Sequence, residues 1–463
     1  MTVRTWVARW NAWRAPRAAD APISLNRQLF ELAWPSLVEN LLQTMLGFVD
    51  LVFVGQLGAD AIAGVGLGNQ LMTLLQVLFM GLAVGNTALV ARAIGAGDPV
   101  DAERVAKQSL LLTGIISIAV AVVGFLYSDA IIRVMGATEN VTEIGGAFLR
   151  VVSVFSIVMG VMLIGGGTLR GAGDTRSPMM ITALINVINI ALDYLLIFGN
   201  FGFPNLGAVG SAVATTIARG VGAALILFVL FQRGAVLQLP LRGRWSLSRE
   251  TFDRVLNIGG PAAAEQIVFQ LGFLTFSAIA IFLGTDDLAA QQVAFNISNL
   301  SILPAFAFGV AATTLVGQNL GAHDAERAEA SAWQALKSGM VWMVLMGVGF
   351  FVWRGWLVGL YTNDPSVQKL GEMCLIFIAL AQPLQAVAVI TASALRGAGD
   401  TRAILVFTFI GIWVVRVALG YLIGIVLGLG LFGLWLGWIA DFITRATLIF
   451  LRFRDGQWKL VQV

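Results

Sequence analysis

The sequence predicts an all-α polytopic membrane protein, and this prediction depends on three observations. Hydrophobic residues make up 58% of the 463 residues and charged residues only 12%, about half the charged share of an ordinary soluble domain. Apolar segments long enough to span a bilayer recur along the whole chain. The motif LRGAGDTR occurs twice, at 169–176 and at 395–402. Soluble, disordered, collagen-like and disulfide-rich classes are excluded, the last because Cys374 is the one cysteine.

A transmembrane helix needs about 20 mostly apolar residues, and twelve segments of the chain meet this requirement. They lie near residues 29–54, 61–90, 105–127, 142–166, 178–199, 208–232, 255–282, 288–316, 330–352, 371–394, 403–427 and 431–451. Because an even number of spans returns the chain to its starting side, we expect both termini on one side of the membrane.

The distribution of lysine and arginine predicts on which side of the membrane the two termini lie. Of the 29 basic residues, 22 lie in the tails and in the loops on the side of the tails, and four fall within spans. The opposite loops hold three, Arg133, Arg354 and Lys369. Cytoplasmic loops carry the excess of Lys and Arg, so we expect a multi-pass inner-membrane protein with cytoplasmic termini. The basic tail 1–28 is either an interfacial helix or a disordered segment.

The duplication predicts the domain organisation. Matching residues such as Glu39 and Glu265 share one offset of 226 residues, so two parallel six-helix repeats follow. We expect a tail at 1–28, an N-lobe at 29–232, a basic linker at 233–254, a C-lobe at 255–452 and a tail at 453–463. Parallel repeats of this kind occur in secondary transporters, with the substrate path between the halves. The LRGAGDTR loops are interpreted as hinges or gates rather than ligand sites.

A polar cluster is predicted in the outward half of the first repeat. Asp50 lies late in the first span, and Asp193 lies late in the fifth with Asn189 one turn before it. Asn186 lies on roughly the same face and supports the cluster. Ionisable residues inside spans are costly and mark function by default. The cluster is therefore a candidate site for a proton or a cation, and the alternative is a polar pair that only ties two helices together.

A second candidate site rests on two equivalent glutamates. Glu39 and Glu265 each follow a proline, Pro35 or Pro261, by four residues. These prolines are expected to bend their helices. Each glutamate lies near mid-membrane without a basic neighbour in sequence, which suits a substrate cation or a second coupling cation. The alternative is a glutamate that is hydrogen-bonded within its own lobe.

The remaining charged residues point to structure rather than catalysis. Asp441 and Arg445 lie one helical turn apart and predict a structural ion pair. Arg416 has no obvious partner in its own helix, and pairing with Glu265 is one possibility. His323 lies in a polar loop, so no nucleophile–base pair is evident and we do not expect an enzyme. A net charge of +3 gives no indication of nucleic-acid binding.

Several of these segments together resemble one known family. The stretches PSLVENLLQTMLGFVD, INIALDYLLIFG and GFPNLGAVGSAVAT, with the duplicated RGAGDTR loops, are similar to those of the multidrug and toxic compound extrusion (MATE) transporters over residues 25–455. The resemblance implies a V-shaped pair of six-helix lobes that export organic cations in exchange for H⁺ or Na⁺. It assigns coupling to Asp50, Asn189 and Asp193, with Na⁺ as a candidate metal ion there, and it matches Glu265 to a glutamate of many members.

We therefore predict an antiporter that exports organic cations by alternating access, with no cofactor apart from the coupling ion. Its partners are expected to be small organic cations and membrane lipids, and the chain is expected to be a monomer. The alternatives are a flippase for lipid-linked precursors, which favours an arginine-rich cavity, and a channel or sensor that does not transport uphill.

Overall fold

The computed structural model describes residues 24–232, 237–240, 245 and 248–461. The described residues form helices joined by short connections, and no strand occurs among them. Eleven of these helices are long and apolar enough to cross a membrane, or twelve if the bent pair α5–α6 is counted as one span. The all-α, polytopic fold class predicted from composition is thus confirmed. The question of an interfacial helix in the tail falls largely on residues 1–23, outside the described residues.

The helices of the first half of the chain follow the predicted spans, with longer ends. They are α2 (Leu25–Gly55), α3 (Ala59–Gly95), α4 (Pro99–Val134), α5 (Glu139–Val154), α6 (Ser156–Gly171), α7 (Arg176–Phe198) and α8 (Gly207–Phe231), with a short 3-10 turn η1 (Asn200–Gly202) before α8. The helices of the second half continue from a start inside the expected linker, since α9 begins at Arg249.

These later helices include three π-helical segments. They are α9 (Arg249–Leu283), α10 (Thr285–Gly321), α11 (Ala325–Gly359), α12 (Pro365–Ala386), η2 (Val387–Thr391), α13 (Ala392–Gly397), α14 (Thr401–Phe409), η3 (Ile410–Val417), α15 (Ala418–Tyr421), η4 (Leu422–Val426), α16 (Gly430–Asp455) and the 3-10 turn η5 (Gln457–Leu460). The π-helices are η2, η3 and η4, and such segments often occur at functional or strained positions.

The chain divides into two compact units. Described residues 38–259 belong to unit 1, and residues 24–37 and 260–461 belong to unit 2. The first helix, α2, is therefore shared: Leu29 and Ala33 are buried in the core of unit 2, whereas the later part of α2 belongs to unit 1. The predicted lobe boundaries at 232 and 255 stay a prediction.

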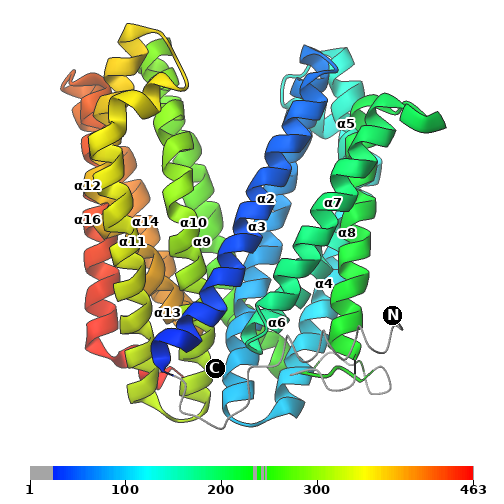
Figure 1. Cartoon of the computed structure of the whole chain (residues 1–463), viewed down its shortest axis with the longest axis vertical. Helices are drawn as coiled ribbons and strands as arrows, with labels where there is room; N and C mark the ends of the chain where they lie inside the picture. Colours follow the sequence, from blue (N-terminus) through cyan, green and yellow to red (C-terminus); the bar gives the residue numbers. More distant parts are fainter. Residues whose placement is uncertain (1–23, 233–236, 241–244, 246–247, 462–463) are drawn as a thin grey trace. The chain divides into compact units, whose positions relative to one another are not determined.

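Unit 1 has an apolar core to which α2, α3, α4, α5, α6 and α8 contribute. Phe79 is fully buried in this core, which also contains Met72, Phe148 and Met159. Figure 1 shows α7 and α8 running next to each other within this unit. In place of a straight fourth span, α5 and α6 meet at a 50° bend next to Phe155. No proline causes this bend, whereas α2 and α9 are each a single helix that contains its proline.

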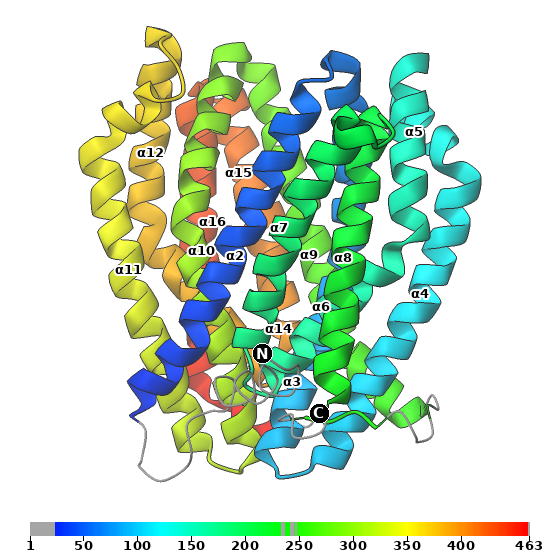
Figure 2. The ribbon, with the colours of Figure 1, turned by 45° about the vertical axis from the view of Figure 1, so that its right-hand side comes forward.

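Unit 2 is organised around aromatic side chains. The buried Trp435 ring lies 4.9 Å from Trp438 and 5.4 Å from Phe295, centroid to centroid. Figure 2 shows α11 and α12 of this unit side by side. Burying a large aromatic side chain contributes on the order of 1.5–3 kcal/mol, so this cluster is a main source of cohesion in unit 2.

The duplicated loop motif has the same construction in both units. A Cβ on Gly171 would lie 2.7 Å from the Thr87 carbonyl oxygen, and one on Gly397 would lie 2.4 Å from the Thr313 carbonyl oxygen. The Thr87 hydroxyl donates to Gly167, as the equivalent Thr313 hydroxyl donates to Ser393. The first glycine of the motif therefore permits close contact between two helices, in addition to the turn expected from the sequence.

The second glycine of each motif makes the turn. Gly173 and Gly399 have φ values of 90° and 89°, in the left-handed region that residues with a Cβ avoid. The aspartates that follow fix the next helix differently. Asp174 accepts from the Ser177 amide at 2.9 Å, whereas Asp400 forms an ion pair with Arg452 at 2.8 Å.

Candidate cation site

Two helices, α2 and α7, bring the predicted polar residues of unit 1 together. Asp50 lies in the last turns of α2, and Asn189 and Asp193 lie one turn apart on α7. Asn189 and Asp193 are fully buried, and Asp50 is half-buried. The sequence thus identified side chains that meet in space, although their role in coupling stays a prediction.

Asn189 is the centre of the hydrogen-bond network. With its amide nitrogen toward the carboxyl groups, it donates to Asp50 Oδ1 at 3.0 Å and to Asp193 Oδ2 at 3.1 Å. Its oxygen then accepts from the hydroxyl and the backbone amide of Thr215 on α8, each at 3.2 Å. The opposite orientation would set the amide oxygen against two carboxyl groups without a donor between them. One asparagine therefore joins α2, α7 and α8.

Asp193 keeps a binding capacity that the protein does not use. Its Oδ1 is buried and receives no hydrogen bond from the described residues. The Asp50 carboxyl lies within hydrogen-bonding reach of Asp193, but two carboxylates share a hydrogen bond only when one is protonated. A buried charged oxygen without a donor is costly. A proton or a small cation bound to this oxygen would remove that cost.

Asn186 lies three residues before Asn189 on α7, and its supporting role at the site stays a prediction. Its side-chain amide donates to the Leu42 carbonyl on α2 at 2.6 Å, and its own Oδ1 has no donor among the described residues. Amide and carboxylate oxygens can both coordinate a cation such as Na⁺. A carboxylate can also bind a proton. Within the described part of the chain, no group of three or more His, Cys, Asp or Glu side chains is placed to hold a metal ion.

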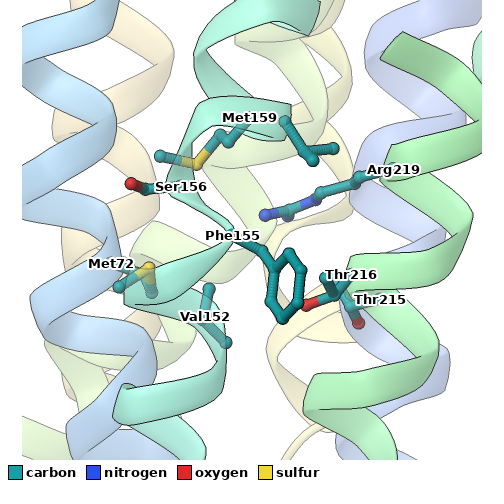
Figure 3. A pocket seen from close by; sticks show the side chains of 9 residues that line it. Met72, Val152, Phe155, Ser156, Met159, Thr215, Thr216 and Arg219 are labelled. Atoms are coloured by element: carbon teal, nitrogen blue, oxygen red, sulfur yellow. The ribbon is translucent and has the colours of Figure 1, made fainter. Parts of the chain in front are cut away.

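A small pocket opens beside this network, and the sequence did not indicate it. It lies at the bend between α5 and α6, and Thr215, Thr216 and Arg219 of α8 line one side (Figure 3). Figure 3 shows the Arg219 side chain extended from α8 toward Phe155 and Met159. The Arg219 guanidinium interacts electrostatically with Asp50.

The two mid-helix glutamates are both held by arginines of the duplicated loops. Arg170 Nη1 donates to Glu39 Oε1 at 3.0 Å within unit 1. Arg396 Nη2 donates to Glu265 Oε1 at 2.6 Å within unit 2. Both pairs are largely buried. The glutamates therefore do have basic partners, which lie 131 residues away in sequence.

A third charged cluster lies in unit 2, where the expected Asp441–Arg445 pair is present. Arg445 Nε donates to Asp441 Oδ1 at 2.6 Å, and Arg416 of η3 also donates to Asp441. All three residues are buried. Pairing of Arg416 with Glu265, one possibility raised by the sequence, is wrong, since Glu265 is held by Arg396.

Comparison of the two repeats explains why Arg445 has an aspartate partner in its own helix, whereas Arg219 does not. At the offset of 226 residues, Arg219 corresponds to Arg445 and Thr215 corresponds to Asp441. The aspartate that neutralises an arginine in unit 2 is thus a threonine in unit 1, where it hydrogen-bonds to Asn189 instead. This substitution was readable in the sequence, but its meaning depends on the contacts.

Comparisons with known proteins agree with the internal duplication. The family model MatE matches residues 35–195 and, a second time, residues 261–422. The two matches begin 226 residues apart (261 minus 35), which is the offset of the sequence repeat.

Relatives and solved structures resemble the chain along nearly its full length. It is 35% identical to the probable multidrug resistance protein NorM of Thermotoga maritima, over 94% of this chain and 93% of the relative. It is 29% identical to the uncharacterized transporter YisQ of Bacillus subtilis, over 95% and 97%. A multidrug resistance MATE family transporter in an outward-facing conformation superposes with a TM-score of 0.87 at 26% identity, covering 93% of this chain and 95% of that one.

Proposed function

Because this chain belongs to the MatE family of multi-pass membrane transporters, we propose that it is a secondary active antiporter. It exports small organic cations from the cytoplasm in exchange for H⁺ or Na⁺, by alternating access and as a monomer. Both termini face the cytoplasm, in keeping with the distribution of Lys and Arg.

The observation that carries the proposal is the Asp193 oxygen without a donor. Asn189 bridges the half-buried Asp50 and the fully buried Asp193, and Asp193 Oδ1 receives no hydrogen bond from the described residues. Binding of one proton or Na⁺ relieves the repulsion between these carboxylates and satisfies the free oxygen. A ligand shifts a conformational equilibrium only through different affinities for the two states. We infer that the state that exposes this pair to the outside binds the coupling ion more tightly.

Glu39 and Glu265 are proposed as places where a cationic substrate or a second cation binds. Each carboxylate is occupied by an arginine, so an incoming cation has to displace that guanidinium. Such an exchange keeps the carboxylate neutralised, and the displaced guanidinium then needs another partner or water, because an unpaired buried charge costs about 3–5 kcal/mol.

The arginines inside unit 2 argue against a flippase for a pyrophosphate-linked lipid. Arg416 and Arg445 are both engaged by Asp441, so neither is free to hold a phosphate group.

The test is transport of ethidium by the reconstituted protein, first under a proton gradient and then under a sodium gradient. Uphill movement with one of the gradients supports antiport and identifies the ion, whereas a channel moves ethidium only downhill. Asp50→Asn and Asp193→Asn are each expected to abolish ion-driven transport. Normal ion-driven transport by either variant would contradict the coupling role of that aspartate. Glu265→Gln with unchanged transport and unchanged ethidium affinity would make Glu265 structural.

A further inference from the structure

Arg219 is a charged residue of α8 to which the proposed coupling mechanism assigns no role so far. Among the described residues its guanidinium forms no ion pair within 4.0 Å. Arg219 lies one helical turn after Thr215, which hydrogen-bonds to Asn189 of the site, and its charge attracts Asp50 over a longer distance. Its repeat mate Arg445 is held by Asp441 at 2.6 Å. The mate of that aspartate is Thr215, so α8 offers Arg219 no carboxylate one turn away.

The charged groups on the elements packed against α8 are otherwise engaged or exposed. On α7 and α6, Arg176 has interactions of its own and Arg170 holds Glu39. On α5, the charged residues pair with α4 or face outward: Arg150 pairs with Asp129, Glu139 pairs with Arg133, and Glu143 is exposed. Asp50 and Asp193 are thus the carboxylates left for Arg219 to neutralise.

The charge of the site follows from these three side chains. With both carboxylates ionised and the guanidinium charged, Asp50, Asp193 and Arg219 carry a net charge of about −1, since arginine stays protonated in proteins. One monovalent cation brings that charge to zero, and a second would leave an uncompensated positive charge in a low-dielectric region. Without Arg219 the pair would carry about −2 and would accommodate two cations.

We propose that Arg219 is a built-in counter-cation that sets the number of coupling ions at one per cycle. This inference rests on the proposed antiport function. Arg219 acts as a positioning residue: it touches neither the coupling ion nor the substrate, and it fixes how much charge the two aspartates can take up. The pocket at the α5–α6 bend gives the long side chain space beside α8.

The first test measures stoichiometry in liposomes, with ethidium as the monovalent substrate and the ion that drives the wild type. A one-for-one exchange is electroneutral, so a tenfold ion gradient should limit wild-type accumulation to about tenfold at any membrane potential. Arg219→Gln should raise the limit toward about a hundredfold and make it depend on potential, and Arg219→Lys should behave as the wild type. Ion-driven transport by Arg219→Gln at an unchanged, potential-independent limit overturns the proposal.

The second test works even if Arg219→Gln binds ethidium without transporting it. In detergent, the slope of log apparent Kd for ethidium against log coupling-ion concentration counts the ions displaced. We expect a slope of about one for the wild type, about two for Arg219→Gln and about zero for Asp50→Asn. Combining Asp50→Asn with Arg219→Gln restores the net charge of −1 and should return the slope to about one.

The role of Arg219 and the antiport function are contradicted by different results. A slope near zero for the combined variant, or a slope near one for Arg219→Gln, contradicts the role of Arg219 while the wild type still couples. Failure of the wild type to accumulate ethidium under either gradient contradicts the antiport function itself, and the counter-cation role falls with it.

Discussion

At the scale of single residues, Thr215 supports the orientation of Asn189, because its hydroxyl and its backbone amide both donate to the Asn189 oxygen. Both bonds favour the orientation in which the amide nitrogen faces Asp50 and Asp193. Thr215→Val removes the hydroxyl donor, while the backbone amide and the shape of the side chain are kept. A hydrogen bond contributes about 0.5–1.5 kcal/mol, so we expect the apparent affinity for the coupling ion to fall about twofold to tenfold.

The control is the neighbouring residue. Thr216 also lines the pocket but has no hydrogen bond to Asn189, so Thr216→Val should leave the ion dependence of ethidium transport unchanged. Equal effects of the two substitutions would contradict the orienting role of Thr215.

The sequence could predict some of these residues and not others for a physical reason. Asp50, Asn189 and Asp193 stand out because charged and amide groups are rare in membrane spans. Thr215 does not, since a helical threonine is usually satisfied by its own helix, as Thr113 is by Ser109. Arg170 and Glu39 are separated by 131 residues, so only the tertiary structure reveals that they pair.

At the scale of the helices, the duplicated motif brings two helix backbones into close contact. A Cβ on Gly397 would lie 2.4 Å from the Thr313 carbonyl oxygen, and neither backbone can yield without separating α13 from α10. We expect Gly397→Ala to destabilise unit 2 by about 1–3 kcal/mol, the usual cost of overpacking. The measurement is the thermal unfolding midpoint in detergent.

A matched substitution distinguishes crowding from a general effect of alanine. Gly66 lies within α3, and a Cβ added to it would have no neighbouring atom within 4 Å, so Gly66→Ala should be neutral or slightly stabilising. A Gly397→Ala protein as stable as the wild type would show that the two helices can separate without cost.

The π-helix η3 is tied to α16 by the buried cluster around Asp441. Asp441→Asn would leave Arg416 and Arg445 close together and without a full negative charge. Breaking a buried ion pair costs about 3–5 kcal/mol, so we expect a large fall in the unfolding midpoint. The exposed pair of Arg133 and Glu139 is the comparison, because Glu139→Gln should cost at most about 1 kcal/mol. Similar losses for the two variants would contradict the structural role of Asp441.

Helix positions were predictable because long apolar segments are a property of the local sequence. Local irregularities were not. The 50° bend at Phe155 lies in a segment without proline, and η3 lies in a continuous apolar run. At η3 the helix packs closely on α16, since a Cβ on Gly411 would lie 2.3 Å from Asp441 Oδ1 and 2.4 Å from Arg445 Cγ, and such tertiary contacts are not visible in a local pattern of apolar residues.

For the molecule as a whole, duplication has preserved architecture and altered charge. Both repeats keep the loop glycines and the glutamate–arginine pair. They differ where Asp50, Asn189 and Asp193 of unit 1 correspond to Phe276, Val415 and Leu419 of unit 2. The cluster of Arg416, Asp441 and Arg445 carries a net positive charge and has no counterpart of the two aspartates of unit 1. The two repeats therefore differ in the charge of their buried polar clusters.

The proposed orientation of the whole chain rests on 22 basic residues on one side against three on the other. The single cysteine, Cys374, is fully buried, so a Cys374→Ala background permits labelling of introduced cysteines with a membrane-impermeant maleimide. In intact cells we expect Thr138→Cys, in the exposed α4–α5 connection, to be labelled. Ala322→Cys and the exposed Leu460→Cys should be labelled only after permeabilisation. The positive-inside tendency predicts this pattern, and the reverse pattern would place both termini outside and contradict the proposed direction of transport.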